Sequence, residues 1–192
     1  MASDPRSRLP WLAAAALALG LGVWSGLARL GWVIPSLADH HPTAHGPLMV
    51  GGFLGTLIGL ERAVALGRWW GYGVPALAAA STLWTAFRPE WRPAAWTLTL
   101  ASLAACAVFI EMLRRRDDLA TRVMALGVLA WLLGNAQWAA SGLVLIAVPW
   151  WAAFLVLTIL GERLELARVL DPPRRSRVAV PTTANPGPGA VK

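Results

Sequence analysis

Six long stretches of apolar residues constrain what this chain can fold into more than any other feature of its sequence. They cover residues 10–34, 45–66, 72–87, 93–112, 122–148 and 149–170. About 20 helical residues cross the roughly 30 Å hydrocarbon core of a bilayer. The 192-residue chain is 57% hydrophobic and only 14% charged, which is too apolar for an ordinary soluble domain. The sequence therefore predicts an all-α polytopic membrane helix bundle with six transmembrane helices.

The distribution of basic residues predicts the orientation of these helices. With six spans, both termini lie on one side of the membrane. That side receives all of the 17 lysines and arginines except Arg29, Arg88 and Arg92. Because loops rich in lysine and arginine stay in the cytoplasm, we expect both termini to be cytoplasmic. The net charge of +7 then needs no nucleic-acid partner, and the lipid bilayer is the expected partner.

The composition also predicts the domain organisation. Residues 1–171 form one transmembrane six-helix domain, with the corner between the last two helices expected at Val148-Pro149 because proline interrupts a helix. Residues 172–192 are rich in proline and glycine and are predicted to be a disordered cytoplasmic tail. Cys106 is the single cysteine and lies in an apolar stretch, which excludes a disulfide framework.

A Glu-Arg pair occurs near the end of the second stretch and again in the last one. These are Glu61-Arg62 and Glu162-Arg163. Charges near the membrane core need partners from another helix, so we predict reciprocal structural pairs, Glu61 with Arg163 and Glu162 with Arg62. Two alternatives remain open: side chains that reach the lipid headgroups, and a proton or ion relay.

Glycines in the second stretch predict close helix packing. Gly51, Gly55 and Gly59 recur every four residues, and such a stripe of small residues lets another helix backbone approach. Gly22 and Gly26 in the first stretch form a matching short stripe.

A second face of the same stretch begins with a histidine. His45, Met49 and Gly52, continued by Thr56 and Gly59, share one side of an α-helix. This pattern suits cofactor binding, with an imidazole–metal bond and a flat group lying against the small residues below it. It suits an ordinary helix contact equally well.

The three histidines of the chain cluster before this face. His40 and His41 lie close to His45 and Asp39, and side chains of these types ligate copper, zinc or a haem iron. The alternative is a polar loop with titrating imidazoles. Further along, Asn135 and Gln137 interrupt the apolar stretch 122–148. Intramembrane polar side chains of this kind either bond across helices or line a cavity for a solute or cofactor.

Two segments carry a resemblance to known families. The string His45-Gly46-Pro47-Leu48-Met49-Val50-Gly51-Gly52-Phe53 resembles the opening of the second helix of haem-copper oxidase subunit I. Together with Gly59-Leu60-Glu61-Arg62-Ala63-Val64-Ala65-Leu66 it also resembles the NnrS-like family of bacterial membrane proteins. That resemblance implies an inner-membrane location, association with haem b or copper, resistance to nitric oxide, and His45 as an axial haem ligand.

The chain departs from these families in two ways that limit the expected function. No histidine follows His45, and haem-copper oxidases have about twice as many spans, so the chain is not a complete oxidase. We expect an integral inner-membrane protein, haem- or copper-associated and linked to respiratory or nitric-oxide-related chemistry. The alternatives are a non-catalytic structural or assembly subunit, packed with other membrane subunits or with a second copy of itself, and a small-solute transporter. Whether the protein is an enzyme stays open.

Overall fold

The protein is a bundle of α-helices. The computed structural model describes residues 8–35, 42–88 and 90–170, and within these ranges it contains six α-helices and no β-strand. The helices are α1 (Leu9–Arg29), α2 (Gly55–Leu66), α3 (Gly73–Phe87), α4 (Trp91–Arg115), α5 (Leu119–Ser141) and α6 (Val144–Leu170). Three short segments precede α2 and α3: the 3-10 turns η2 (Pro42–Ala44) and η4 (Trp69–Tyr72) and the π-helical segment η3 (Pro47–Leu54). The prediction of an all-α fold is confirmed.

Five segments are long and apolar enough to cross a membrane. They are Leu9–Arg29, Pro47–Leu66, Trp91–Arg115, Leu119–Ser141 and Val144–Arg168. The third predicted span corresponds to α3, which has 15 residues and is shorter than the roughly 20 residues that a bilayer core requires. Large apolar side chains on the outside of the bundle, such as Leu145 at 75% exposed and Val156 at 63%, fit a surface that faces lipid. These features are consistent with a multi-pass membrane protein.

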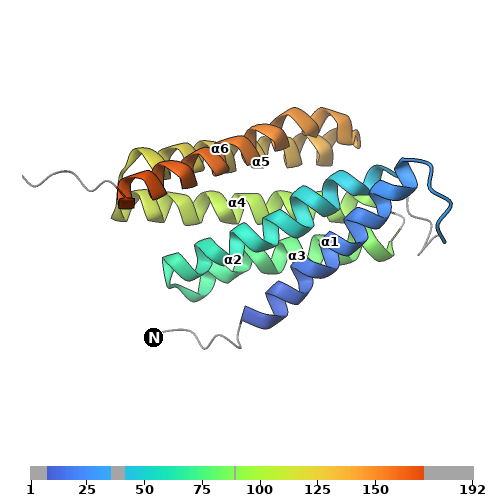
Figure 1. Ribbon diagram of the computed structural model, residues 1–192, viewed down its shortest axis with the longest axis horizontal. Coiled ribbons are helices and arrows are strands. Elements are labelled where there is room, and N and C mark those ends of the chain that lie inside the picture. Colours follow the sequence, from blue (N-terminus) through green and yellow to red (C-terminus); the bar gives the residue numbers. More distant parts are fainter. Residues whose placement is uncertain (1–7, 36–41, 89, 171–192) are drawn as a thin grey trace, which may run out of the picture.

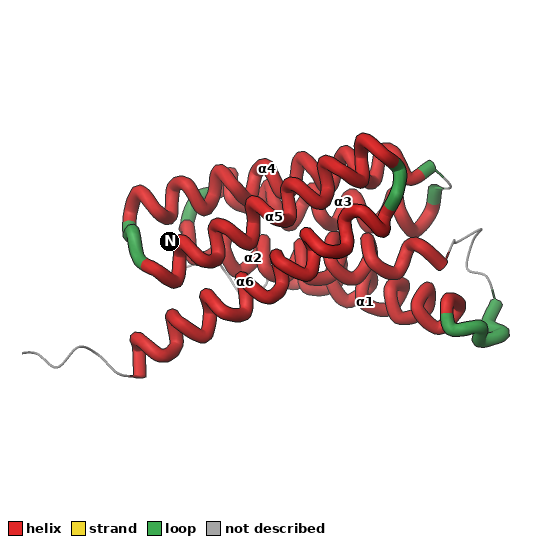
Figure 2. The backbone as a smooth tube through the Cα atoms, turned by 90° about the horizontal axis from the view of Figure 1, so that it is seen from above, coloured by secondary structure: helices red, strands yellow, loops and turns green. Residues whose placement is uncertain are grey.

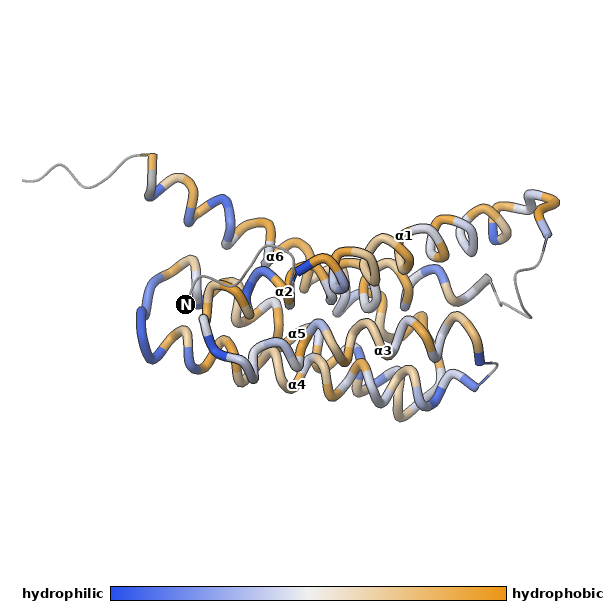
Figure 3. Tube along the Cα trace, turned by 90° about the horizontal axis from the view of Figure 1, so that it is seen from below, coloured by the Kyte–Doolittle hydropathy of each residue, from blue (hydrophilic) through white to orange (hydrophobic). Residues whose placement is uncertain are grey.

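The helices run side by side along the bundle axis. Figure 1 shows that α6 ends at the left end of the bundle, whereas α1 starts nearer to its middle and runs to the right. The segment η3–α2 packs against α1 and α3, whereas α6 packs mainly on α5, which in turn packs on α4. Seen from above and below, α1 and α6 are the outer helices on one side of the bundle and diverge from each other (Figures 2 and 3). The most hydrophilic turns, including the one between α4 and α5, lie towards the ends of the bundle (Figure 3).

The corner between α5 and α6 differs from the prediction. The expected break at Val148-Pro149 is wrong, because α5 ends at Ser141 and α6 already begins at Val144, with Pro149 inside it. Gly142 ends α5 with a φ of +77°, and its N–H bonds the Trp138 carbonyl at 2.8 Å. Glycine adopts this left-handed conformation without steric cost. Pro149 lies in the first turns of α6, where its missing N–H removes one hydrogen bond near the helix end.

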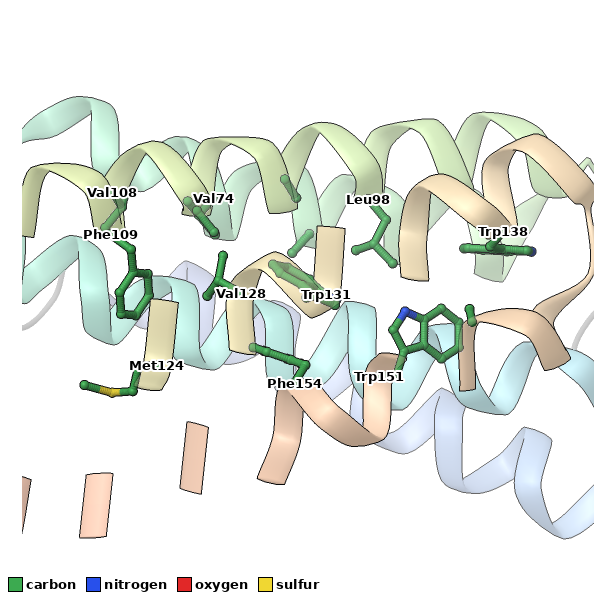
Figure 4. Packing of buried hydrophobic residues seen from close by; sticks show 14 of the residues in the cluster. Val74, Leu98, Val108, Phe109, Met124, Val128, Trp131, Trp138, Trp151 and Phe154 are labelled. Carbon is green, nitrogen blue, oxygen red and sulfur yellow. The ribbon is translucent and has the colours of Figure 1, made fainter. Parts of the chain in front are cut away.

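The core of the bundle is made of small residues and a few large rings. Alanines of α3, α4 and α5 are buried together with Leu98 and Val108. Trp131 stacks on Phe154 of α6, with ring centroids 5.1 Å apart and an interplanar angle of 14° (Figure 4). The predicted tail, residues 172–192, lies outside the described residues.

Candidate functional site

The segment from His45 to Leu66 is the centre of the candidate site, because neighbouring helices cover it on several sides. Gly51 lies against the Leu98 side chain of α4, and a Cβ atom added at Gly55 would lie 2.7 Å from the Trp131 ring of α5. A Cβ atom at Gly59 would lie 2.6 Å from Val74 of α3. The three glycines that form one stripe in the sequence thus lie against three different helices.

His45 lies where this segment meets α1. Its Nδ1 is 2.8 Å from the carbonyl oxygen of Gly22. A carbonyl oxygen can only accept, so Nδ1 carries the proton and donates it. In the neutral ring the lone pair is then on Nε2. Gly26, one turn further along α1, leaves room for the imidazole, since an added Cβ atom there would lie 2.8 Å from Nδ1.

The surface below His45 is not open. Met49 packs its sulfur against α1, 2.7 Å from the position of a Cβ atom at Gly22. Gly52 lies against Thr82 of α3 and 3.0 Å from the methyl group of Ala18 in α1, again measured to an added Cβ atom. Side chains of α1 and α3 therefore lie against Gly52 in this structure, and a flat group at this face stays a prediction.

The histidine cluster is only partly described. His40 and His41, the other predicted metal ligands, lie outside the described residues. In the part of the chain that the structure covers, no group of three or more His, Cys, Asp or Glu side chains is arranged to hold a metal ion. His45 is therefore the one predicted ligand whose surroundings can be described, and it offers a single ring nitrogen.

The charges at the other end of α2 converge on Arg62. Its side chain is 8% exposed, and Nη2 is 3.2 Å from both Glu61 and Glu162. Nη1 is 3.8 Å from Glu165, also on α6. The predicted contact between Arg62 and Glu162 is present, but the predicted pair of Glu61 with Arg163 is not. Arg163 is exposed and takes part in none of the ion pairs among the described residues.

Glu61 pairs with Arg62 and not with the predicted Arg163, and this difference has a geometric reason. Neighbouring residues on a helix point in different directions, yet the long Arg62 side chain reaches back to the Glu61 carboxylate while it also contacts α6. One guanidinium thus faces three carboxylates. Its Nε atom is buried and lacks a hydrogen-bond partner among the described residues.

A small cavity lies between Arg62 and the stacked rings of Trp131 and Phe154. Its volume is about 10 Å³, which is room for about one water molecule. Gly55, Gly59 and Val74 complete one side of it, and residues of α4 and α5 the other. Figure 4 shows the rings and the aliphatic side chains around this region. A cavity of this size does not hold a macrocycle.

Asn135 and Gln137 tie α5 to α6. The Trp151 indole N–H donates to Oδ1 of Asn135 at 2.8 Å, and the Asn135 amide donates to the Leu98 carbonyl of α4 at 3.4 Å. The Trp150 indole N–H donates to Oε1 of Gln137 at 3.1 Å. Asn135 and Gln137 were predicted either to bond across helices or to line a cavity. In this structure both side chains form hydrogen bonds between helices.

The sequence pattern of a family described as a domain of unknown function (DUF8744) matches residues 8–185. The chain belongs to this family. No curated protein matches the chain, and no solved structure matches it.

A cluster of tryptophans near His45 was not predicted from the sequence of this DUF8744 protein. Trp151 is only 2% exposed. Its ring lies 6.0 Å from that of Trp138, which in turn lies 6.4 Å from Trp91. Trp151 also lies 3.2 Å from the position of a Cβ atom at Gly46, next to His45. The sequence feature that pointed to this cluster is Asn135, because a buried amide needs a hydrogen-bond donor from another helix.

Proposed function

We propose that this DUF8744 protein is a multi-pass protein of the bacterial inner membrane that binds haem b or copper through His45 and serves respiratory or nitric-oxide-related chemistry. The proposal includes six spans with both termini in the cytoplasm. The observation that carries it is the 2.8 Å contact from Nδ1 of His45 to the Gly22 carbonyl. Histidines that bind metals almost always donate their other ring N–H in this way, which fixes the tautomer and the ring orientation.

The residues around His45 fit a metal held through one imidazole nitrogen. Gly22 supports Nδ1, so Nε2 keeps its lone pair for a ligand bond. His45 would hold a haem iron or a copper ion through Nε2, and His40 or His41 is the candidate for a second ligand. A bound haem iron or copper ion would supply electron exchange or the binding of a small diatomic molecule. The chain itself orients the ring through Gly22 and holds α1 close at Gly26.

The test is the absorption spectrum and metal content of the purified protein. Cells that make the protein are supplied with a haem precursor and with copper, and the Soret band and bound copper are measured. We expect one of these signals in the parent and its loss in His45→Ala. Thr43→Ala, an exposed neighbour in η2, is the matched control and should keep the signal. A colourless, metal-free parent, or a His45→Ala variant with an unchanged signal, contradicts the proposal.

A second candidate function is a non-catalytic subunit of a larger membrane complex. It is favoured by the exposure of the two outer helices: 22% of the most apolar stretch of α1 and 28% of that of α6 is buried, against 50% for Pro47–Leu66 and for α5. A partner helix could pack on either of them. This candidate predicts a colourless protein that purifies in fixed proportion with another membrane protein after mild detergent extraction.

A further inference from the structure

The π-helical segment η3 changes the direction in which the candidate ligand points. Residues Pro47–Leu54 form η3, which runs without a break into α2. A π-helix bonds i to i+5, so it contains an extra residue compared with an α-helix. Such segments are rare; they occur mostly as single-turn bulges inside α-helices, frequently at functional sites. Gly51 and Gly52 lie within η3, and glycine weakens the preference for a regular α-helix.

Contacts at both ends of this helix depend on its rotation. At the N-terminal end of the segment η3–α2, called the upper end here, His45 and Met49 face Gly26 and Gly22 of α1. At the C-terminal end, called the lower end, Gly59 lies against Val74 of α3. One residue corresponds to about 100° of rotation in an α-helix. If the same sequence were α-helical throughout, the upper contacts and the lower contacts could not both form.

We propose that η3 carries one residue in excess, and that this residue is what directs His45 and Met49 towards α1. The segment η3 therefore positions His45. That His45 binds a metal or haem rests on the proposed function, whereas the extra residue in η3 does not. Two structural consequences follow. Removing one residue from η3 produces a continuous α-helix in which both ends keep their directions. Adding one residue rotates the upper end away from α1.

The test uses disulfide crosslinks at the two ends of the helix. The native cysteine is removed by Cys106→Ser. One reporter combines Gly22→Cys with Met49→Cys, where a Cβ atom at Gly22 lies 3.0 Å from Cγ of Met49. The other combines Gly59→Cys with Val74→Cys, where the corresponding distance to Cβ of Val74 is 3.2 Å. Both are short enough for a disulfide after small adjustments.

Each cysteine pair is then combined with one of two changes that shorten or lengthen η3 by one residue at the same position. One deletes Phe53, a half-buried residue of η3, and the other inserts an alanine after it. We expect the deletion to form both crosslinks to about the parent level. The insertion should form the upper crosslink at least about tenfold less, because the rotated cysteines are out of reach.

The proposal is tested by the difference in the yield of the upper crosslink between the deletion and the insertion variant. If η3 held no extra residue, both changes would rotate the upper end and lose the upper crosslink to a similar degree, which overturns the proposal. Loss of the lower crosslink in the deletion variant, through misfolding or rotation, overturns it as well. The crosslinks form without metal or haem, so a failure of the proposed function in the spectrum leaves this test unaffected.

Discussion

At the scale of single residues, Arg62 of α2 forms ion pairs with Glu162 and Glu165 of α6. It is 7% exposed, while the carboxylates around it are more accessible, with the Glu162 side chain 40% exposed and that of Glu165 51% exposed. A buried charge is stable only when it is paired. The guanidinium therefore depends on these carboxylates, whereas the carboxylates can be hydrated when it is removed.

Replacement of Arg62 should destabilise the protein more than replacement of the neighbouring arginine on α6. We expect Arg62→Leu to lower the free energy of unfolding by about 1–3 kcal/mol, because it removes charged hydrogen bonds between α2 and α6. Arg163→Leu, which removes an exposed side chain, should change it by less than about 0.5 kcal/mol. Thermal unfolding of both variants in the same detergent measures the difference. Equal losses would mean that the cluster around Arg62 contributes nothing specific.

At the scale of elements, the start of α5 has the most complete cap among the described helices. Asp118 accepts from the backbone N–H and from the hydroxyl of Thr121, each at 2.9 Å. It also contacts Arg168 of α6 at 2.8 Å and Arg116 at 2.9 Å. The Thr121 backbone N–H, followed by the Thr121 hydroxyl and the two arginines, lowers the pKa of the Asp118 carboxyl below its ordinary value of 3.8.

The cap predicts a loss of stability in acid. Because the folded-state pKa of Asp118 is lowered, its contribution is complete above the ordinary pKa of 3.8 and is lost as the pH falls below it. Asp118→Asn keeps a capping side chain without the charge, so its Tm should fall less between pH 5 and pH 3 than that of the parent. Asp118→Ala should cost about 1 kcal/mol at pH 7. An Asn variant with the same pH dependence as the parent would assign the acid sensitivity to other groups.

At the scale of the whole molecule, α6 ends at one end of the bundle, and α1 runs away from that end (Figure 1). The basic turn between α4 and α5, with Arg114, Arg115 and Arg116, lies near this end as well. The turn between α5 and α6 lies at the opposite end. An even number of passages through the membrane, with the basic end in the cytoplasm, stays a prediction.

Cysteine labelling tests this orientation. In a Cys106→Ser background, Leu143→Cys places a thiol in the exposed turn between α5 and α6, and Asp117→Cys places one in the turn between α4 and α5. We expect an impermeant maleimide to label position 143 in intact spheroplasts and position 117 only after lysis. The opposite pattern would reverse the orientation, and labelling of both positions in intact spheroplasts would contradict a membrane between them.

Part of the candidate site was visible in the sequence. His45 was singled out by its place at the start of a helix, and Arg62 by its depth in the apolar stretch. The partner of His45 was not visible, because His45 bonds a backbone carbonyl, which every residue of α1 possesses, and no side chain marks Gly22 as the acceptor. Arg62 meets Glu162 as expected, but Glu61 and Glu165 share it because of its reach and the rotation of α6.

The sequence by itself determined that the chain forms apolar helices, because each of its long apolar stretches must satisfy its own backbone hydrogen bonds in lipid. It did not determine where two of them meet, since the left-handed conformation of Gly142, supported by its contact with Trp91, ends α5 before Pro149 is reached. Tertiary structure also decided which way each face of the central helix points. A periodic pattern assumes a regular α-helix, whereas the π-helical turn at Pro47–Leu54 changes the rotation of everything before it.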